Sequence, residues 1–175
     1  GVPPIGFVDE LTRRDLVVLE LSSFQLQDLD RSPWIAVVLN ITEDHLDHHA
    51  DRKEYVVAKK SICRFQRARD SLIFNRDCAQ ARGFAAASVA QHLEFSVTGE
   101  VATGAWIEDS RICLRRPSGN KETICLVEEI QLKGGHNQEN AAAAVAATAA
   151  AGATAPQIAA GIRRFKGLEH RIESV

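Results

Sequence analysis

An apolar run followed at once by polar and acidic residues most constrains the fold of this chain. Residues 35–39 read IAVVL, and an uninterrupted run of this kind is typical of a strand buried on both faces. Residues 40–47 read NITEDHLD, which places three acidic side chains and His45 after the carboxyl end of that strand. Ligands bind at this edge in open α/β sheets. Taken alone, the stretch is also explained as a helix start with Thr42 as N-cap and acids favoured by the helix dipole.

Length and charge narrow the class of protein. A chain of 175 residues can form one domain with a sizeable core and no disulfide bonds. A net charge of −2 without a basic run argues against a nucleic-acid surface or an anionic membrane as partner. No stretch reaches the roughly 20 apolar residues of a membrane span. The expected partners are therefore small molecules, and the absence of methionine predicts that the sequence is a piece of a longer protein.

The four cysteines show no metal-binding or catalytic spacing. None forms a CxxC pair, and each has apolar neighbours, so we interpret them as reduced thiols of a cytosolic protein. A disulfide between Cys113 and Cys125 across a hairpin is the alternative. The cysteines are Cys63, Cys78, Cys113 and Cys125.

Hydrophobic periodicity predicts an α/β fold with a mostly parallel sheet flanked by helices. Buried strands are expected at residues 16–21, 34–39 and 70–75. Helical spacing begins near Arg52 and returns in an alanine-rich segment and in a short helix opened by Pro156. Between them, short apolar runs broken by turn residues predict a smaller region of antiparallel hairpins at residues 93–97, 105–107, 111–114 and 123–127.

Two charged residues fall where an apolar environment is predicted. Glu20 lies near the end of the run of residues 16–21, and a buried carboxylate is costly unless it is paired or bound to a cation. It therefore points to a site at the end of that strand, although a wetter face of the strand would also accommodate it. Lys59 has apolar residues three and four positions away on both sides, so it should point inward from its helix.

Two further groups could bind a ligand. Asn137 and Asn140 are three residues apart at the start of the alanine-rich helix, after paired glycines, and two amides on one helix face can bind the edge of a base. Helix capping by Asn137 with a solvent-facing Asn140 is the plainer interpretation. His170 and Arg171 follow a glycine and could clamp a phosphate, or form a surface pair in a linker.

Five motifs in order and spacing resemble the Mur ligases. They are ELSSFQL at residues 20–26, LNITEDHLD at 39–47, YVVAK at 55–59, GHNQENA at 135–141 and GLEHRIE at 167–173. The family is cytoplasmic, ATP-dependent and built from three domains, and the chain resembles only its central, P-loop ATPase-like domain. The resemblance implies an acyl-phosphate intermediate and attack by an amino acid. The ELSSFQL motif is similar to that of the member which adds D-glutamate to UDP-N-acetylmuramoyl-L-alanine.

The resemblance also implies roles for the singled-out residues. Glu20 and His45 match magnesium-binding positions, and Lys59 matches a lysine that is carbamylated in the family and supports a second Mg²⁺. Carbamylation needs a neutral amine, which apolar neighbours of a lysine favour. These three residues are the expected catalytic set.

The remaining positions concern ATP and substrate. Asn137 and Asn140 match positions that contact the ATP base, and Arg171 matches one near its phosphates. Ser22 and Ser23 lie in the substrate-site motif, and His45 is expected to serve the substrate as well as the metal.

One departure from the family limits what the chain can do alone. No Gly-Lys-Ser or Gly-Lys-Thr of a phosphate loop occurs in the sequence. We therefore expect residues 1–165 to be a central domain without its P-loop portion, and residues 166–175 to start a linker to a further domain. The chain alone is expected to be inactive, and the complete protein to be a cytoplasmic, monomeric ligase. The alternatives are another Mur ligase, a folylpolyglutamate synthase-like ligase, or a non-catalytic nucleotide-binding domain.

Overall fold

The computed structural model describes residues 4–41 and 52–167. Its strands form a single six-stranded sheet in the order β1-β2-β3-β4-β5-β6. Neighbours are parallel from β1 to β4 and antiparallel from β4 to β6. The strands are β1 (Ile35–Val38), β2 (Ser71–Asn75), β3 (Gln91–Ser96), β4 (Gly104–Glu108), β5 (Arg111–Arg115) and β6 (Lys121–Leu126).

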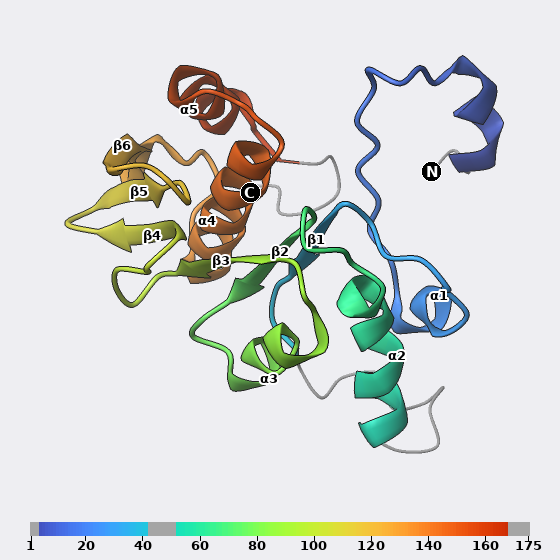
Figure 1. The fold of residues 1–175 in the computed structure, drawn as a ribbon. Coiled ribbons are helices and arrows are strands. Elements are labelled where there is room, and N and C mark those ends of the chain that lie inside the picture. Colours follow the sequence, from blue (N-terminus) through green and yellow to red (C-terminus); the bar gives the residue numbers. More distant parts are fainter. Residues whose placement is uncertain (1–3, 42–51, 168–175) are drawn as a thin grey trace.

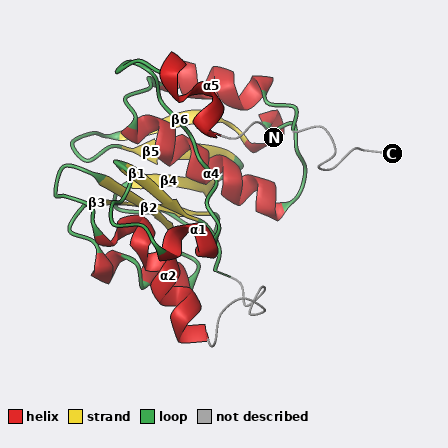
Figure 2. Cartoon of the chain, turned by 90° about the vertical axis from the view of Figure 1, so that its right-hand side faces the viewer, coloured by secondary structure: helices red, strands yellow, loops and turns green. Residues whose placement is uncertain are grey.

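Helices cover both faces of this sheet. In Figures 1 and 2, α2 and α3 lie on one face and α4 and α5 on the other, while α1 packs against α2. The predicted α/β class with a mostly parallel sheet is therefore confirmed. The helices are α1 (Ser23–Gln27), α2 (Arg52–Arg64), α3 (Ala79–Arg82), α4 (Gly135–Ala150) and α5 (Ala155–Arg164), with short 3-10 turns at Pro4–Glu10, Ala85–Ala87 and Val127–Glu129.

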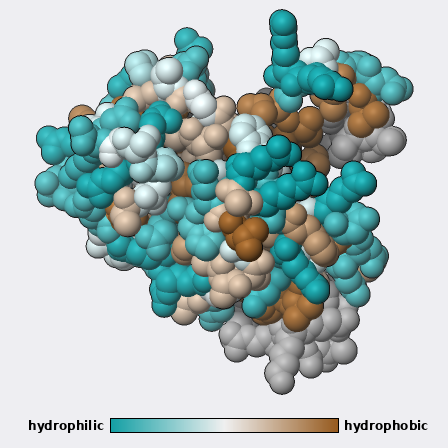
Figure 3. Space-filling view, in the orientation of Figure 1, coloured by the Kyte–Doolittle hydropathy of each residue, from teal (hydrophilic) through white to brown (hydrophobic). Residues whose placement is uncertain are grey.

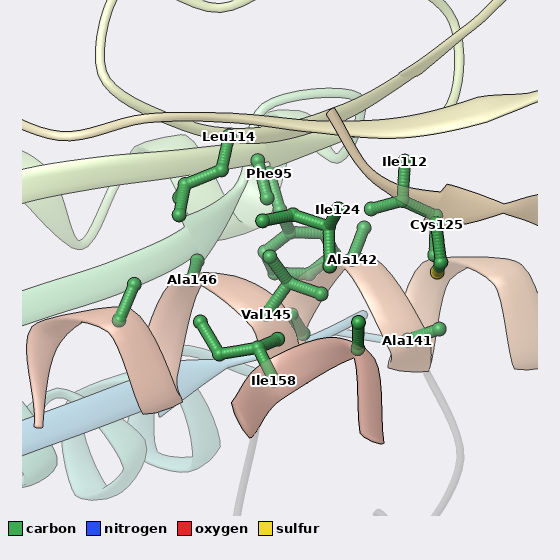
Figure 4. Packing of buried hydrophobic residues seen from close by; sticks show 14 of the residues in the cluster. Phe95, Ile112, Leu114, Ile124, Cys125, Ala141, Ala142, Val145, Ala146 and Ile158 are labelled. Carbon is green, nitrogen blue, oxygen red and sulfur yellow. The ribbon is translucent and has the colours of Figure 1, made fainter. Parts of the chain in front are cut away.

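The larger hydrophobic core lies between the sheet and α4 with α5. Figure 4 shows Ala142 and Val145 of α4 facing Phe95 and Ile124 of the sheet, with Ile158 of α5 beside Val145. The many alanines of α4 let its backbone approach the strands closely, because a methyl group needs little room. A smaller core on the opposite face joins β1 and β2 to α2 and α3.

The predicted hairpin between residues 93–97 and 105–107 is wrong. Strand β3 runs parallel to both β2 and β4, and only β4, β5 and β6 form antiparallel pairs. Asp77, at the end of β2, fixes the loop that follows β3 in a shape that is not a hairpin turn. Its carboxylate accepts hydrogen bonds from the Ser96 hydroxyl (2.8 Å), the Val97 amide (2.9 Å) and the Thr98 hydroxyl (2.7 Å).

These bonds also shift the acidity of Asp77. Burial alone would raise the pKa of its carboxyl, but the hydrogen bonds from Thr98, Val97 and Ser96, with the charge of Arg76, outweigh burial. The pKa of Asp77 is therefore held below its ordinary value of 3.8. The carboxylate form is the one that organises the loop.

The predicted buried strand at residues 16–21 is also wrong. This segment forms no strand, and the apolar side chains of residues 16–19 are exposed, with Val18 at 94%. A strand needs a neighbour for its backbone groups, and in the described sheet β1 is an edge strand that pairs only with β2. For the same reason β1 is not buried on both faces, since Val37 is 36% exposed. Figure 3 shows hydrophobic surface along the N-terminal segment.

The cysteines are free thiols, and the minority prediction of a disulfide is wrong. Cys63, Cys113 and Cys125 are buried and Cys78 is half-buried. Cys113 pairs in register with Thr123, so it does not face Cys125 across the β5–β6 ladder. Burial raises the pKa of the Cys63 and Cys125 thiols to about 11, which makes them poor nucleophiles. Among the described helices, none is long and apolar enough to cross a membrane.

Candidate functional site

A cavity of about 750 Å³ opens between α4, α5 and the segment that leads into α4. This volume is in the range of small-molecule sites. Its wall is mostly apolar, contributed by small side chains of α4 and by residues of α5 such as Ile158 and Ile162. Asn137 and Asn140 both line it, as their spacing of three residues on one helix predicts.

The start of α4 is shaped by glycine and by a side chain that bonds backward. Gly134 precedes the helix with φ of 103°, a left-handed conformation that side chains disfavour. The Asn137 side-chain NH₂ donates to the Lys133 carbonyl at 2.8 Å, so the amide oxygen of Asn137 is left as an acceptor. Asn137 therefore holds the entry to the helix and still offers an acceptor at the cavity.

A chain of hydrogen bonds crosses the carboxyl edge of the sheet beside this helix. Asn75, the last residue of β2, donates through Nδ2 to Oδ1 of Asn40 at 2.8 Å. Asn40 in turn donates through Nδ2 to Oε2 of Glu139 at 2.5 Å. Two parallel strands and the first turns of α4 are thereby joined at the edge where ligands bind in α/β sheets.

Asn40, Asn75 and Glu139 were not predicted as site residues. A usable signal was present, because Asn40 follows one predicted parallel strand and Asn75 ends the next, and the carboxyl ends of neighbouring parallel strands lie side by side. Glu139 carried no signal, since an acid in the first turns of a helix is ordinary.

The other predicted residues lie on the opposite layer. Ser22 is the N-cap of α1: its hydroxyl accepts from the Gln25 amide at 3.3 Å, and its own amide donates to the Gln25 side chain at 2.9 Å. Glu20 is exposed, just ahead of this helix, and Ser23 is half-buried in it. The fold thus packs α1, which Ser22 caps and Ser23 begins, against α2, which carries Lys59.

Lys59 is half-buried on α2. Its ammonium lies 4.7 Å from the ring centroid of Tyr55, one helical turn earlier, and the Tyr55 side chain is buried. A cation over an aromatic face is stabilised by the ring quadrupole. The aromatic contact also keeps the amine close to its helix.

Four of the predicted residues lie outside the described part of the chain, namely Thr42, His45, His170 and Arg171. Within residues 4–41 and 52–167, no group of three or more histidine, cysteine, aspartate or glutamate side chains could hold a metal ion. The described residues therefore bring together Asn137 with Asn140, and Ser22 and Ser23 with the helix of Lys59, but they do not complete a metal site.

Comparison with known proteins gives the family. Residues 7–148 match the model of the Mur ligase middle domain. UDP-N-acetylmuramoylalanine–D-glutamate ligase from Symbiobacterium thermophilum is 45% identical over 178 residues, which cover 100% of this chain and 39% of that protein. The protein of the same name from Acidobacterium capsulatum is 41% identical over 177 residues, covering 100% of this chain and 38% of its own length.

A solved structure supports the fold. UDP-N-acetylmuramoyl-L-alanyl-D-glutamate–2,6-diaminopimelate ligase superposes with a TM-score of 0.66 at 24% identity, over 89% of this chain and 33% of that one. The chain spans 38–39% of the two curated relatives above. With most of its length matched by the middle-domain model, the chain belongs to the Mur ligase family.

Proposed function

We propose that this chain is the ATP-binding central domain of a ligase that joins D-glutamate to UDP-N-acetylmuramoyl-L-alanine in peptidoglycan precursor synthesis. In the proposed reaction the substrate carboxylate attacks the γ-phosphorus of ATP, which releases ADP and leaves an acyl phosphate. The amine of D-glutamate then attacks the acyl carbon, the amide forms, and phosphate leaves. We also propose that the complete protein acts as a monomer in the cytoplasm.

The observation that carries this proposal is the cavity at the start of α4. Its apolar wall suits the faces of a planar base, while Asn137 and Asn140 offer amide groups to the edge of the base. The similarity to two D-glutamate ligases supports the same reading. The two asparagines are therefore assigned to the ATP base, and Arg171 to the phosphates.

Magnesium would be held by Glu20, His45 and a carbamylated Lys59. Bound Mg²⁺ neutralises charge between a carboxylate and a phosphate, which is the chemistry that acyl-phosphate formation needs. Glu20 is exposed and can reach a cation, and Lys59 is half-buried on α2 with its amine 4.7 Å from the Tyr55 ring centroid. Ser22 and Ser23, beside the same helix, are assigned to the substrate together with His45.

The domain assignment follows from these roles. Residues 1–165 form the central domain without a P-loop portion, and residues 166–175 begin the linker to the next domain. Since the 175 residues contain no Gly-Lys-Ser or Gly-Lys-Thr, the chain alone is proposed to be inactive.

The test uses the protein expressed from the complete gene. ADP release is measured with UDP-N-acetylmuramoyl-L-alanine, Mg²⁺ and, in parallel reactions, D-glutamate, L-lysine and diaminopimelate, and the amide product is identified by mass. We expect turnover with D-glutamate alone. Turnover with another amino acid would reassign the chain to a sister ligase, and failure to hydrolyse ATP with any of them would overturn the assignment to a ligase of UDP-N-acetylmuramoyl-L-alanine.

Carbamylation of Lys59 can be tested directly by ¹³C NMR. The complete protein is depleted of CO₂ and then supplied with ¹³C-bicarbonate, and a carbamate carbon signal is sought by NMR in the parent and in Lys59→Arg. We expect a signal that Lys59→Arg lacks. An identical spectrum for the two proteins would remove Lys59 from the metal site.

A further inference from the structure

The amide of Asn40 joins two parts of the fold that are distant in sequence. Glu139 is 99 residues from Asn40, and the hydrogen bond between their side chains connects the end of β1 to the first turns of α4. The second bond of Asn40, from Asn75, ties the same amide to the end of β2. One side chain thus fixes three elements relative to one another.

Glu139 sets the donor and the acceptor of each hydrogen bond in the series that joins Asn75, Asn40 and Glu139. A carboxylate can only accept, so Asn40 must turn its NH₂ toward Glu139 and its oxygen toward Asn75. Asn75 must then donate through its own NH₂, which leaves its oxygen to accept from the Asp77 amide at 2.8 Å. The Asn75 side chain is only 2% exposed, and each of its polar groups has a partner.

These connected hydrogen bonds favour one orientation of each side-chain amide. Asn40 and Asn75 each use both ends of the amide, so neither can rotate by half a turn without losing two hydrogen bonds at once. These three side chains therefore add directed hydrogen bonds between α4 and the two strand ends to the buried core that packs α4 against the sheet.

The two ends of the link lie next to different parts of the proposed site. Glu139 belongs to the same first turns of α4 as Asn137 and Asn140, which line the cavity proposed for the base, but its own side chain does not line it. Asn40 comes five residues before His45 in the sequence. We propose that Asn40 and Glu139 are positioning residues of the ligase: their bond sets the spacing between the base-contacting turn of α4 and the strand end that leads to the metal-binding residue.

This inference rests on the proposed function, and its test is a double-mutant cycle in the complete protein. Asn40→Ala, Glu139→Ala and the double variant are compared with the parent for kcat, for KM of ATP and for the Mg²⁺ concentration that gives half-maximal rate. We expect each single variant to lose about tenfold in kcat, which corresponds to one charge-assisted hydrogen bond, and the double variant to lose no more. The half-maximal Mg²⁺ concentration should rise in all three, which a purely structural role would not cause.

Two matched variants separate positioning from general damage. Glu139→Gln keeps a side-chain oxygen as acceptor, so it should retain kcat within about twofold. Glu128→Ala removes an exposed carboxylate of the short turn before α4 and should leave kcat and the Mg²⁺ dependence unchanged. Additive losses in the cycle, or a Glu139→Gln variant as impaired as Glu139→Ala, would overturn the inference.

A third variant reports on the contact even without catalysis. Asn40→Asp has the same shape but sets a second carboxylate against Glu139, so the folded protein should be destabilised relative to Asn40→Ala at neutral pH. The difference should shrink as the pH falls toward the ordinary range of carboxyl pKa values, because the repulsion between two carboxylates raises the pKa of one of them, which therefore takes up a proton first. If the parent makes no amide product but this pH dependence is found, the proposed function fails while the contact stands. If the parent is active and the pH dependence is absent, the positioning link fails alone.

Discussion

Gly104, at the start of β4, occupies a position that only glycine fits. Its φ is 122°, and a β-carbon there would lie 1.9 Å from the carbonyl oxygen of Glu94 on β3. Both the left-handed backbone and the overlap with a rigid neighbour penalise any side chain. The close approach allows β4 to pair with β3 in the parallel direction after a short loop.

We therefore expect Gly104→Ala to lower the free energy of unfolding by about 3 kcal/mol. The measurement is chemical denaturation followed by circular dichroism. Gly99→Ala is the control, since its added carbon would meet only the Arg76 side chain, at an ordinary distance of 3.5 Å. Equal effects of the two substitutions would mean that the β3–β4 contact is looser than described.

Asp77 gives the fold a specific sensitivity to acid. Because the pKa of its carboxyl is lowered on folding, its contribution to stability is present above the ordinary value of 3.8 and is lost as the pH falls through the folded value. Asp77→Asn should lower the free energy of unfolding by about 1–3 kcal/mol at pH 7, since three donors then face a weaker acceptor.

The difference in the free energy of unfolding between Asp77→Asn and the parent should narrow as the pH falls below the ordinary value of 3.8 and through the lower pKa of Asp77 in the folded parent. Unfolding curves across pH 3–7 would measure it. Asp109→Asn is a matched control, because Asp109 is an exposed turn residue with φ of 48° that asparagine also tolerates. A gap that stayed constant with pH would mean that the charge of Asp77 is not what holds the loop.

At the scale of elements, the local hydrophobic pattern predicted whether most segments are helix or strand, but it did not predict which strands pair with one another. The helix from Arg52 and the strands near residues 34–39 and 70–75 were predicted correctly, since period and β-branched content are written in the segment itself. The parallel pairing of β3 with β4 was not predicted, because the loop between them is held by hydrogen bonds to Asp77, which follows another strand, β2. The run at residues 16–21 was predicted as a buried strand, but no strand in the described sheet pairs with it.

The exposed apolar side chains of this run should affect the self-association of the 175-residue chain more than its stability. Val18 is 94% exposed, so Val18→Ser should change the free energy of unfolding by less than about 0.5 kcal/mol while reducing self-association. Sedimentation and denaturation would measure the two effects. The same substitution at the buried Val38, which is 5% exposed, should cost about 2 kcal/mol or more. A large loss of stability from Val18→Ser would mean that the run is packed in solution.

At the scale of the whole molecule, the sheet divides the candidate site between its two layers. The helical spacing of Asn137 and Asn140 was sufficient to predict that they share a surface, and both line one cavity. Ser22, Ser23 and Lys59 lie with α1 and α2 on the other layer, and no single segment of sequence could indicate that separation. The Asn40–Glu139 bond, which joins the end of β1 to α4, was not predicted because its residues are 99 positions apart.

This division leads to a final prediction about nucleotide binding by the 175-residue chain. The cavity of about 750 Å³ offers a place for the base, whereas the chain holds no Gly-Lys-Ser or Gly-Lys-Thr to donate backbone amides and a lysine to the phosphates. ATP should therefore bind within about tenfold of the affinity of adenosine, since the phosphates add little. Protein from the complete gene should prefer ATP strongly. Calorimetric titrations with both ligands would measure this, and Asn140→Ala should weaken both equally in the 175-residue chain. A strong preference of that chain for ATP would mean that its own residues bind the phosphates, and that the base cavity is not the main source of affinity.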